Sequence, residues 1–254
     1  MTTKDKALTI IDPSTYAIAT PDALEFMADI DAPSFDELPL IKVPAGGGTS
    51  WELPNGEPAK EFQGIILDRQ ETRGYWISSF EETGGGSPPD CSSLDNRHGN
   101  GMYDGTHFNA EGDLLNPGGL CQVNGVVRCP MAQWGSGKGN AQACRLITRV
   151  PILLPDALLP AILRLPPSSY GKNDQDGIAA GVRKYEVNQV SLGRRLWQVI
   201  TAVSLVKDTS AGNHEYSAAR FRSLGNVPPA LAAVVKRYRE AFLPTITAAA
   251  VEAE

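Results

Sequence analysis

The four cysteines of the chain all lie in one Pro- and Gly-rich stretch, residues 88–144, and this clustering limits the possible folds more than any other feature. They are Cys91, Cys121, Cys129 and Cys144, with 29, 7 and 14 residues between successive members. The stretch has little helical or strand periodicity, so it lacks the pattern of a hydrophobic core of its own. A metal ion bound by the four thiols would supply the order that a core otherwise provides.

We interpret the four cysteines as ligands of a structural Zn²⁺ ion. Zinc favours four sulfur or nitrogen ligands in a tetrahedron, and a site closed by four thiolates lacks the open position of a catalytic zinc. The spacings differ from the C-x2-C pairs of common zinc ribbons. His98 and His107 lie in the same stretch and are alternative ligands, and four free thiols are the simpler alternative.

Two further patterns in this stretch were weighed as catalytic sites and rejected. The run Gly135–Gly139 resembles a phosphate-binding loop, but Ala132 and Gly139 stand where that motif needs Gly and Ser or Thr, and no strand precedes it. A set of acidic and histidine residues could hold a catalytic divalent metal, yet its spacing matches no hydrolytic pattern and turn formation explains it equally well. That set is Asp90, Asp95, His98, Asp104 and His107. We therefore expect a protein that is not an enzyme.

Outside this stretch the sequence predicts short strands and few helices. The expected strands are 61–68, 75–78, 145–154, 161–165, 196–206 and 215–224, with a turn at 69–74 and a bend or bulge at Gly64. Helices are expected at 177–192 and from 228 to 244. This inventory predicts a mainly β fold with a few helices, organised as an OB-fold-like small barrel with a long zinc-stapled loop insertion.

The predicted domain organisation follows from breaks in composition. Residues 1–60 read as an extended acidic N-terminal arm, with a short helix at 21–27, an extended segment at 38–43 and Trp51 as its anchor on the following domain. Residues 61–244 form the OB-like domain, with the zinc loop inserted at 84–144. Residues 245–254 form a short acidic tail without regular structure.

Charge and hydropathy restrict the setting and the class of partner. No apolar run is long enough to span a membrane and no secretory signal is evident, so we expect a cytoplasmic protein in a reducing compartment, the host cytoplasm if a phage encodes it. The net charge is −6, but residues 144–239 hold 14 bases and 6 acids. A basic segment is typical of proteins that bind a polyanion, and an ordinary solvated surface is the alternative.

Aromatic and cationic residues alternate in a way that suits single-stranded DNA, whose bases stack on rings and whose phosphates need cations. The candidate DNA-binding residues are Arg69, Arg73, Tyr75, Trp76, Trp134, Lys138, Arg194, Arg195, Trp197, Tyr216, Arg220 and Arg222. The alternative for Trp76, Trp197 and Phe221 is burial in the core. Strand alternation places Arg220 and Arg222 on one face and Phe221 on the other, which favours a core position for Phe221 and solvent-facing positions for the two arginines.

The stretch also resembles a known group of proteins. The residues P-D-C-S-S-x-D, then G-x-x-C, then C-P-x-x-x-W-G-S with a lysine before the last cysteine, resemble zinc-containing single-stranded DNA-binding proteins of bacteriophages and mobile elements. The resemblance covers roughly residues 62–225 and extends to V-I-T-A-V-S-L at 199–205 and E-Y-S-A-A-R-F at 215–221. This chain departs from the group in the wider spacing of Cys121 and Cys129 and in the greater distance of Lys138 from Cys144.

The resemblance implies a single-stranded DNA-binding protein of phage-type replication or recombination, with a structural zinc ion and little sequence preference. Its partners would be single-stranded DNA and replication or recombination proteins. The alternative is a structural or interaction module, such as a virion or replisome component, whose zinc loop binds protein. The acidic first 60 residues favour that alternative, and the basic 144–239 segment favours DNA.

Overall fold

The computed structural model describes residues 16–20, 34–44, 46–78, 88–101, 120–124, 126–138, 141–171, 181–209 and 213–249. The chain divides into two compact units. The first contains residues 1–69 and 150–246, and the second contains residues 70–149 and 247–254. The described part is mainly β, as the sequence predicts, with two α-helices, α4 (Val182–Ser191) and α5 (Pro229–Ala248). Neither helix is long and apolar enough to cross a membrane.

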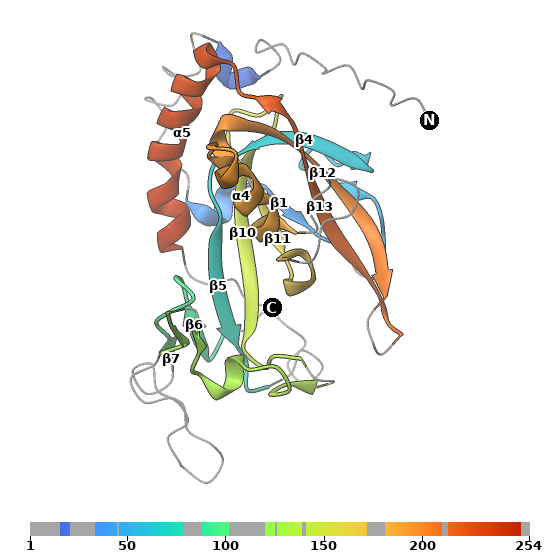
Figure 1. The fold of residues 1–254 in the computed structure, drawn as a ribbon, viewed down its shortest axis with the longest axis vertical. Helices are drawn as coiled ribbons and strands as arrows, with labels where there is room; N and C mark the ends of the chain where they lie inside the picture. Colours follow the sequence, from blue (N-terminus) through green and yellow to red (C-terminus); the bar gives the residue numbers. More distant parts are fainter. Residues whose placement is uncertain are drawn as a thin grey trace. The chain divides into compact units, whose positions relative to one another are not determined.

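The first unit is built on a mixed sheet. Its strands pair in the order β13-β12-β4-β10-β11-β1, in which β1 runs parallel to β11 and the β12–β13, β12–β4 and β4–β10 pairs are antiparallel. β12 and β13 form the long hairpin seen in Figure 1. The strands are β1 (Leu40–Lys42), β4 (Glu61–Ile66), β10 (Arg145–Leu153), β11 (Ala161–Leu165), β12 (Val199–Thr209) and β13 (Glu215–Asn226), and a separate pair joins β2 (Trp51–Glu52) to β3 (Pro58–Ala59).

The sheet is not closed into a barrel, and the oligonucleotide-binding barrel expected from the sequence is not confirmed. β13 and β1 are the two ends of the strand order in this unit, and they do not pair with each other within the described residues. What is confirmed is the coarser expectation, a mainly β chain with a few helices.

Both faces of this sheet carry a hydrophobic core. Along β4, Phe62 and Ile66 belong to one buried cluster, while Ile65 and the following Leu67 belong to another. This alternation follows from the two-residue period of a strand. The first cluster includes Val182 and Tyr185 of α4, and the second includes Leu231, Val235, Tyr238, Phe242 and Ile246 of α5. A sheet covered on both sides explains why its strands are nearly continuous apolar runs.

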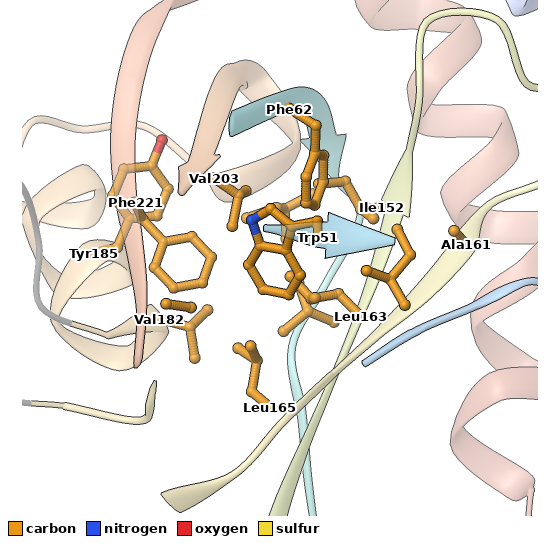
Figure 2. Close-up of a cluster of buried hydrophobic side chains, with 14 of the residues drawn as sticks. Trp51, Phe62, Ile152, Ala161, Leu163, Leu165, Val182, Tyr185, Val203 and Phe221 are labelled. Atoms are coloured by element: carbon orange, nitrogen blue, oxygen red, sulfur yellow. The ribbon is translucent and has the colours of Figure 1, made fainter. Parts of the chain in front are cut away.

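Trp51 lies in the middle of the first cluster. Its side chain is 1% exposed and meets Phe62 edge-on, with ring centroids 5.4 Å apart (Figure 2). On the other side of the cluster Tyr185 stacks on Phe221 at 5.8 Å. The expectations that Trp51 anchors the N-terminal segment and that Phe221 faces the core are therefore confirmed. Burying an indole of this size contributes roughly 2–3 kcal/mol.

Several element boundaries differ from the prediction. The second strand, β5 (Gln70–Tyr75), occupies the residues assigned to a turn, and the predicted strand at 75–78 is wrong. β5 is polar at most positions, so it lacks the apolar alternation that marks a strand, and its pairing with residues 145–149 of β10 defines it. α5 continues through Pro244 to Ala248, which corrects the expected end of that helix and the start of the tail. The expected helix at 21–27 and residues 250–254 lie outside the described residues.

Gly64 lies where the neighbouring strand comes closest to β4. A Cβ at this position would be 2.6 Å from Cγ1 of Ile152 and 2.7 Å from the carbonyl oxygen of Leu153. The pairing of β4 with β12 is regular through Gly64, so the glycine allows close strand packing and makes no bulge there.

We predict that Gly64→Ala lowers the free energy of unfolding by about 2 kcal/mol, because the added methyl group overpacks a site bounded by backbone. Urea denaturation measures the change. Gly171→Ala is the matched control, since the nearest neighbour of its new Cβ, Cβ of Arg183, is 4.0 Å away. An equal, small effect of both substitutions would contradict the close approach.

Candidate metal centre and nucleic-acid interface

The second unit brings the four cysteines together from four separate segments. Its strands are β5, the first half of β10, β6 (Cys91–Ser93), β7 (Asn100–Gly101), β8 (Gln122–Val123) and β9 (Val126–Val127). Cys91 begins β6, Cys121 precedes β8, and Cys144 immediately precedes β10. Cys129 precedes the short 3-10 turn Pro130–Ala132. Each cysteine therefore stands at the end of a short element, where the chain changes direction.

All four thiols are buried and none forms a disulfide. The exposed fractions are 4% for Cys91, 2% for Cys121, 1% for Cys129 and 3% for Cys144. Burial raises the pKa of Cys91 to about 12, and the neighbouring Cys121 and Cys129 add to this rise. Burial likewise raises the pKa of Cys144 to about 12, where Arg73 opposes the rise and the other three cysteines increase it. These mutual effects place the four sulfurs in one neighbourhood.

Backbone hydrogen bonds hold the turns that carry these cysteines. The carbonyl oxygen of Cys121 accepts hydrogen bonds from the N–H groups of Arg128 at 2.9 Å and Cys129 at 3.3 Å. The N–H of Cys144 donates to the carbonyl oxygen of Met131 at 2.7 Å. These bonds join the segments around Cys121, Cys129 and Cys144 to each other, so their arrangement is set by backbone geometry as well as by side-chain packing.

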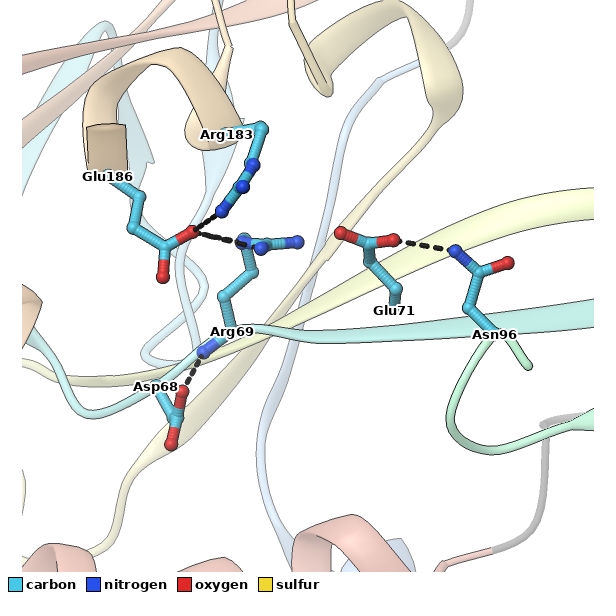
Figure 3. Close-up of polar contacts among 6 residues, drawn as sticks. All are labelled: Asp68, Arg69, Glu71, Asn96, Arg183 and Glu186. Carbon is cyan, nitrogen blue, oxygen red and sulfur yellow. Dashed lines mark hydrogen bonds and ion pairs between the residues drawn. The ribbon is translucent and has the colours of Figure 1, made fainter. Parts of the chain in front are cut away.

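Arg73 is a buried residue whose hydrogen bonds hold the backbone next to the cysteines. It is 5% exposed, and its guanidinium donates to Oδ1 of Asn96 and to the carbonyl oxygen of Cys144, the latter at 3.1 Å. Asn96 in turn donates to Glu71 at 2.6 Å, the contact drawn in Figure 3. Asn96 adopts a positive φ of 56°, which Asn tolerates better than most residues. The guanidinium of Arg73 is thus committed to this unit, and the predicted phosphate contact is not available to it.

The residues present fit a zinc ion in their chemistry. Four buried thiols offer the soft ligands that Zn²⁺ prefers, and ionised buried thiolates would require a nearby cation such as a metal. In their described positions, however, no three or more His, Cys, Asp or Glu side chains form a group arranged to hold a metal ion. The structure therefore assembles the donor types in one neighbourhood without showing a coordination geometry.

His98, one of the two alternative zinc ligands, is exposed, whereas the four cysteines are buried. The imidazole of His98 is 72% exposed, and its Nδ1 lies 2.7 Å from Oδ2 of Asp95. Burial opposes ionisation of Asp95, but hydrogen bonds from His98, Arg97 and Ser93 outweigh it and lower the Asp95 pKa to about 2. His98 is thus an exposed partner of a carboxylate. His107, together with Asp104, lies outside the described residues.

The segment after Cys129 forms a tightly hydrogen-bonded loop. Ser136 Oγ donates to the carbonyl oxygens of Gln133 at 2.7 Å and Met131 at 2.8 Å, and it accepts from the N–H of Ala143 at 3.0 Å. Gly135 has a φ of 89°, which side chains disfavour, and a Cβ on Gly137 would approach the backbone of Ala143 to 2.9 Å. The W-G-S sequence therefore encodes this compact turn.

Trp134 projects from this loop. Its side chain is 69% exposed, the largest exposed fraction among the large hydrophobic residues of the described chain. Lys138, four residues later, is also exposed, and its ammonium group has no ion-pair or hydrogen-bond partner among the described residues. An exposed aromatic ring and an unpaired cation thus lie in one hydrogen-bonded loop, and the contact with DNA expected of this pair stays a prediction.

Tyr75 and Trp76 lie in the same unit but are less accessible. Tyr75 is half-buried and packs against the small cluster of Cys129, Ala132 and Cys144. Burial raises its pKa, with smaller contributions from Asp90 and the cysteines. Trp76 is half-buried. Tyr75 therefore supports the cysteine cluster directly.

In the first unit most candidate cations are engaged in pairs. Arg69 is ion-paired to Glu186 at 2.9 Å (Figure 3), and its guanidinium lies 5.8 Å from the ring centre of Tyr170. Arg222 pairs with Glu61 at 2.9 Å, and Arg194 donates to Asn226 at 3.2 Å.

Two other candidates of this unit lie on the β12–β13 hairpin. Arg220 is only 8% exposed, and its guanidinium donates to the carbonyl oxygen of Ala219 at 3.3 Å. The hydroxyl of Tyr216 donates to Asp208 at 2.9 Å. The expectation that Arg220 faces solvent is therefore wrong, and the hydroxyl of Tyr216 is already engaged by a carboxylate.

Arg195 and Trp197 are the exceptions in this unit. Both flank Leu196 in the short 3-10 turn before β12 and line a cavity of about 370 Å³. Sequence reasoning identified these two but missed the other polar members of the lining, Asp68, Glu186 and Arg239. The i, i+3 spacing of Arg183 and Glu186 on α4 could have predicted their ion pair from the sequence. No sequence pattern links this pair to Asp68 or to Arg239 on α5, because those residues are distant along the chain.

Comparison with known proteins adds no relative. The chain matches no protein-family model, no curated protein and no solved structure. The resemblance of the cysteine motif therefore stays a resemblance of residues, and the function rests on the site itself.

We predict that Arg73→Leu destabilises the second unit by about 3 kcal/mol, because it leaves the buried Asn96 oxygen and the Cys144 carbonyl without their donor. Chemical denaturation monitored by circular dichroism measures the change. The matched control is Arg222→Leu, which removes a half-exposed ion pair with Glu61 and should cost less than about 1 kcal/mol. Equal costs would show that Arg73 is not a buried support.

Proposed function

We propose that this protein binds single-stranded DNA without catalysing a reaction, as a component of phage-type replication or recombination. The observation that carries the proposal is the loop of the second unit that holds the exposed indole of Trp134 and the unpaired ammonium of Lys138. Binding to single strands without sequence preference needs these two groups, a flat aromatic face for a base and a cation for phosphate.

The rigidity of the loop strengthens this proposal. Stacking on an aromatic side chain contributes about 1–3 kcal/mol per base, and more of it is retained when the ring is held in place before binding. The Ser136 hydrogen bonds and the Gly135 turn hold the backbone around Trp134, so little loop entropy is lost on binding.

We further propose that Cys91, Cys121, Cys129 and Cys144 bind one Zn²⁺ ion that stabilises this loop. Zinc would neutralise the thiolates and replace the hydrophobic core that the unit lacks. Arg73 and the backbone bonds around Cys121 would then hold the ligands in register.

The oligonucleotide-binding character of the fold is part of the same proposal. Proteins of that type present cations and aromatics on a small curved sheet, and the zinc-stapled loop would add a further ring and cation. An open mixed sheet can also offer these groups, so the proposal does not depend on barrel closure.

Trp134 also supports the second candidate function, a structural or interaction module of a virion or replisome. Tryptophan is enriched among the residues that dominate protein–protein affinity. In that case the same exposed indole would bind a partner protein, and binding of oligonucleotides would be weak.

We predict that the protein binds an oligo-dT of roughly 30 nucleotides in preference to duplex DNA, and that its affinity falls steeply with salt. Trp134→Ala should weaken binding by about 1–2 kcal/mol at every salt concentration. Lys138→Ala should reduce the slope of log affinity against log salt by about one, since one phosphate contact is lost. Fluorescence anisotropy of the labelled oligonucleotide measures both.

The control is Ile77→Ala, which removes another exposed apolar side chain of the second unit, 57% exposed, and should leave the affinity unchanged. Absence of binding at low salt would refute the DNA-binding proposal and favour the interaction module. Binding that does not depend on Trp134 or Lys138 would show that the loop is not the contact.

We predict that the purified protein contains about one zinc per chain and that Cys129→Ser lowers this content and the melting temperature. Atomic emission spectrometry and thermal unfolding, with and without a chelator, provide the measurements. Val126→Ser is the control, because it introduces the same hydroxyl at a 54% exposed position of the same unit and keeps all four cysteines. Equal metal content in both variants would exclude Cys129 as a ligand.

A further inference from the structure

The first unit contains a cavity of about 370 Å³, within the size range of small-molecule sites. Its wall is formed by the end of β4, by α4, by the turn before β12 and by α5. The lining residues are Leu67, Asp68, Glu186, Arg195, Leu196, Trp197 and Arg239. Four segments, from three distant parts of the sequence, thus meet around one concave, largely polar space.

Each charged side chain of the cavity lining except Arg195 is paired within the described residues. The two carboxylates of the lining are already paired: Asp68 lies 2.6 Å from Arg239, and Glu186 lies 2.9 Å from Arg69 and 2.8 Å from Arg183. Arg195 is a further, exposed cation, and its guanidinium has no partner among the described residues. The lining itself is balanced, with two guanidinium groups and two carboxylates, and the unpaired guanidinium of Arg195 is the group available to an anionic ligand.

The lining is held in place by its own contacts. Arg239 also donates to the carbonyl oxygen of Leu67 at 3.0 Å, so its guanidinium is fixed at two points. Glu186 accepts both arginines with a single oxygen, Oε2, and its other oxygen, Oε1, accepts no hydrogen bond from the described residues (Figure 3). One acceptor of the carboxylate therefore remains for a ligand.

Trp197 supplies the aromatic wall. It is half-buried and packs against the second hydrophobic cluster, which fixes the orientation of its ring. Beside it stands Arg195, two residues earlier in the same turn. These groups match one nucleotide. The ring can stack on the base, the unpaired guanidinium can neutralise the phosphate, and the open carboxylate oxygen can accept a hydrogen bond from an amino group of the base.

We propose that this cavity binds one nucleotide unit whose base carries an exocyclic amino group. Trp197 contacts the base, Arg195 contacts the phosphate, and Oε1 of Glu186 accepts a hydrogen bond from the amino group. Carboxylates accept from the N4 amino group of cytosine in this way, whereas thymine has no amino group to donate. The nucleotide is either one position of a bound strand, which rests on the proposed function, or a free nucleoside monophosphate.

The test compares strands and mononucleotides. Anisotropy with oligo-dC and oligo-dT of roughly 30 nucleotides reports strand binding. Calorimetric titration with dCMP and dTMP reports binding of the free unit. We expect a preference of about fivefold for dC over dT, and a loss of about one unit of salt slope in Arg195→Ala.

The matched control is Arg237→Ala, which removes an equally exposed arginine of α5 that does not line the cavity. Arg195 is exposed, so its replacement should leave the melting temperature unchanged, and a thermal scan verifies this. Trp197→Leu provides a second variant that should weaken the binding of dC, because it removes the ring on which the base stacks.

The possible outcomes distinguish the cavity proposal from the proposal of single-stranded DNA binding. Strand binding with equal affinities for dC and dT, and equal behaviour of Arg195→Ala and Arg237→Ala, would overturn the cavity proposal and leave the DNA-binding proposal intact. Binding of dCMP that depends on Arg195, without strand binding, would uphold the cavity as a free-nucleotide site and overturn the DNA-binding proposal. Absence of both would overturn both.

Discussion

Burial of both faces of the sheet is the constraint on which the first unit depends. Strands β4, β10, β11 and β12 place successive side chains alternately into two hydrophobic clusters, one with α4 and one with α5. Because neither face is solvated, most residues in the strand centres are apolar, and the close contact at Gly64 leaves no room for a side chain. Thr201 of β12 and Arg220 of β13 are buried exceptions, while Asp68, Glu186 and Arg239 meet beyond the end of β4 and on the helices.

The second unit is organised on a different principle. Its buried hydrophobic cluster is small, comprising Cys129, Ala132 and Cys144 with a few half-buried neighbours. Order there comes from backbone hydrogen bonds between turns and from a buried polar chain of Arg73, Asn96 and Glu71. Such a unit has little apolar burial to offset its conformational entropy, which is the physical reason for proposing a metal ion at its four thiols.

Most of the arginines that the sequence suggests as contacts for a polyanion are already held by other groups of the protein. Arg69, Arg194 and Arg222 are held by carboxylates or an amide, and Arg73 and Arg220 are buried. Among the candidate DNA-binding cations of the described residues, Lys138 and Arg195 stay available: Lys138 lies in the same loop as Trp134, and Arg195 lines the cavity with Trp197. The proposed nucleic-acid contacts therefore depend on a few places where a cationic side chain and an aromatic ring occur together. The general excess of Lys and Arg between residues 144 and 239 matters less.

The sequence alone was sufficient to predict the features that depend on local residue patterns. Apolar periodicity identified β10, β11 and the β12–β13 hairpin, alternation placed Phe221 in the core, and the C-P-x-x-x-W-G-S motif marked the loop of Trp134. The tertiary structure decided what depends on distant partners. It made a strand of the polar residues Gln70–Tyr75 by pairing them with β10, left the sheet open, and turned Arg69 and Arg73 from surface candidates into supports. It also assembled the cavity from four separate segments. Strand pairing and side-chain pairing join residues from 71 to 171 positions apart, and no local sequence window contains both partners.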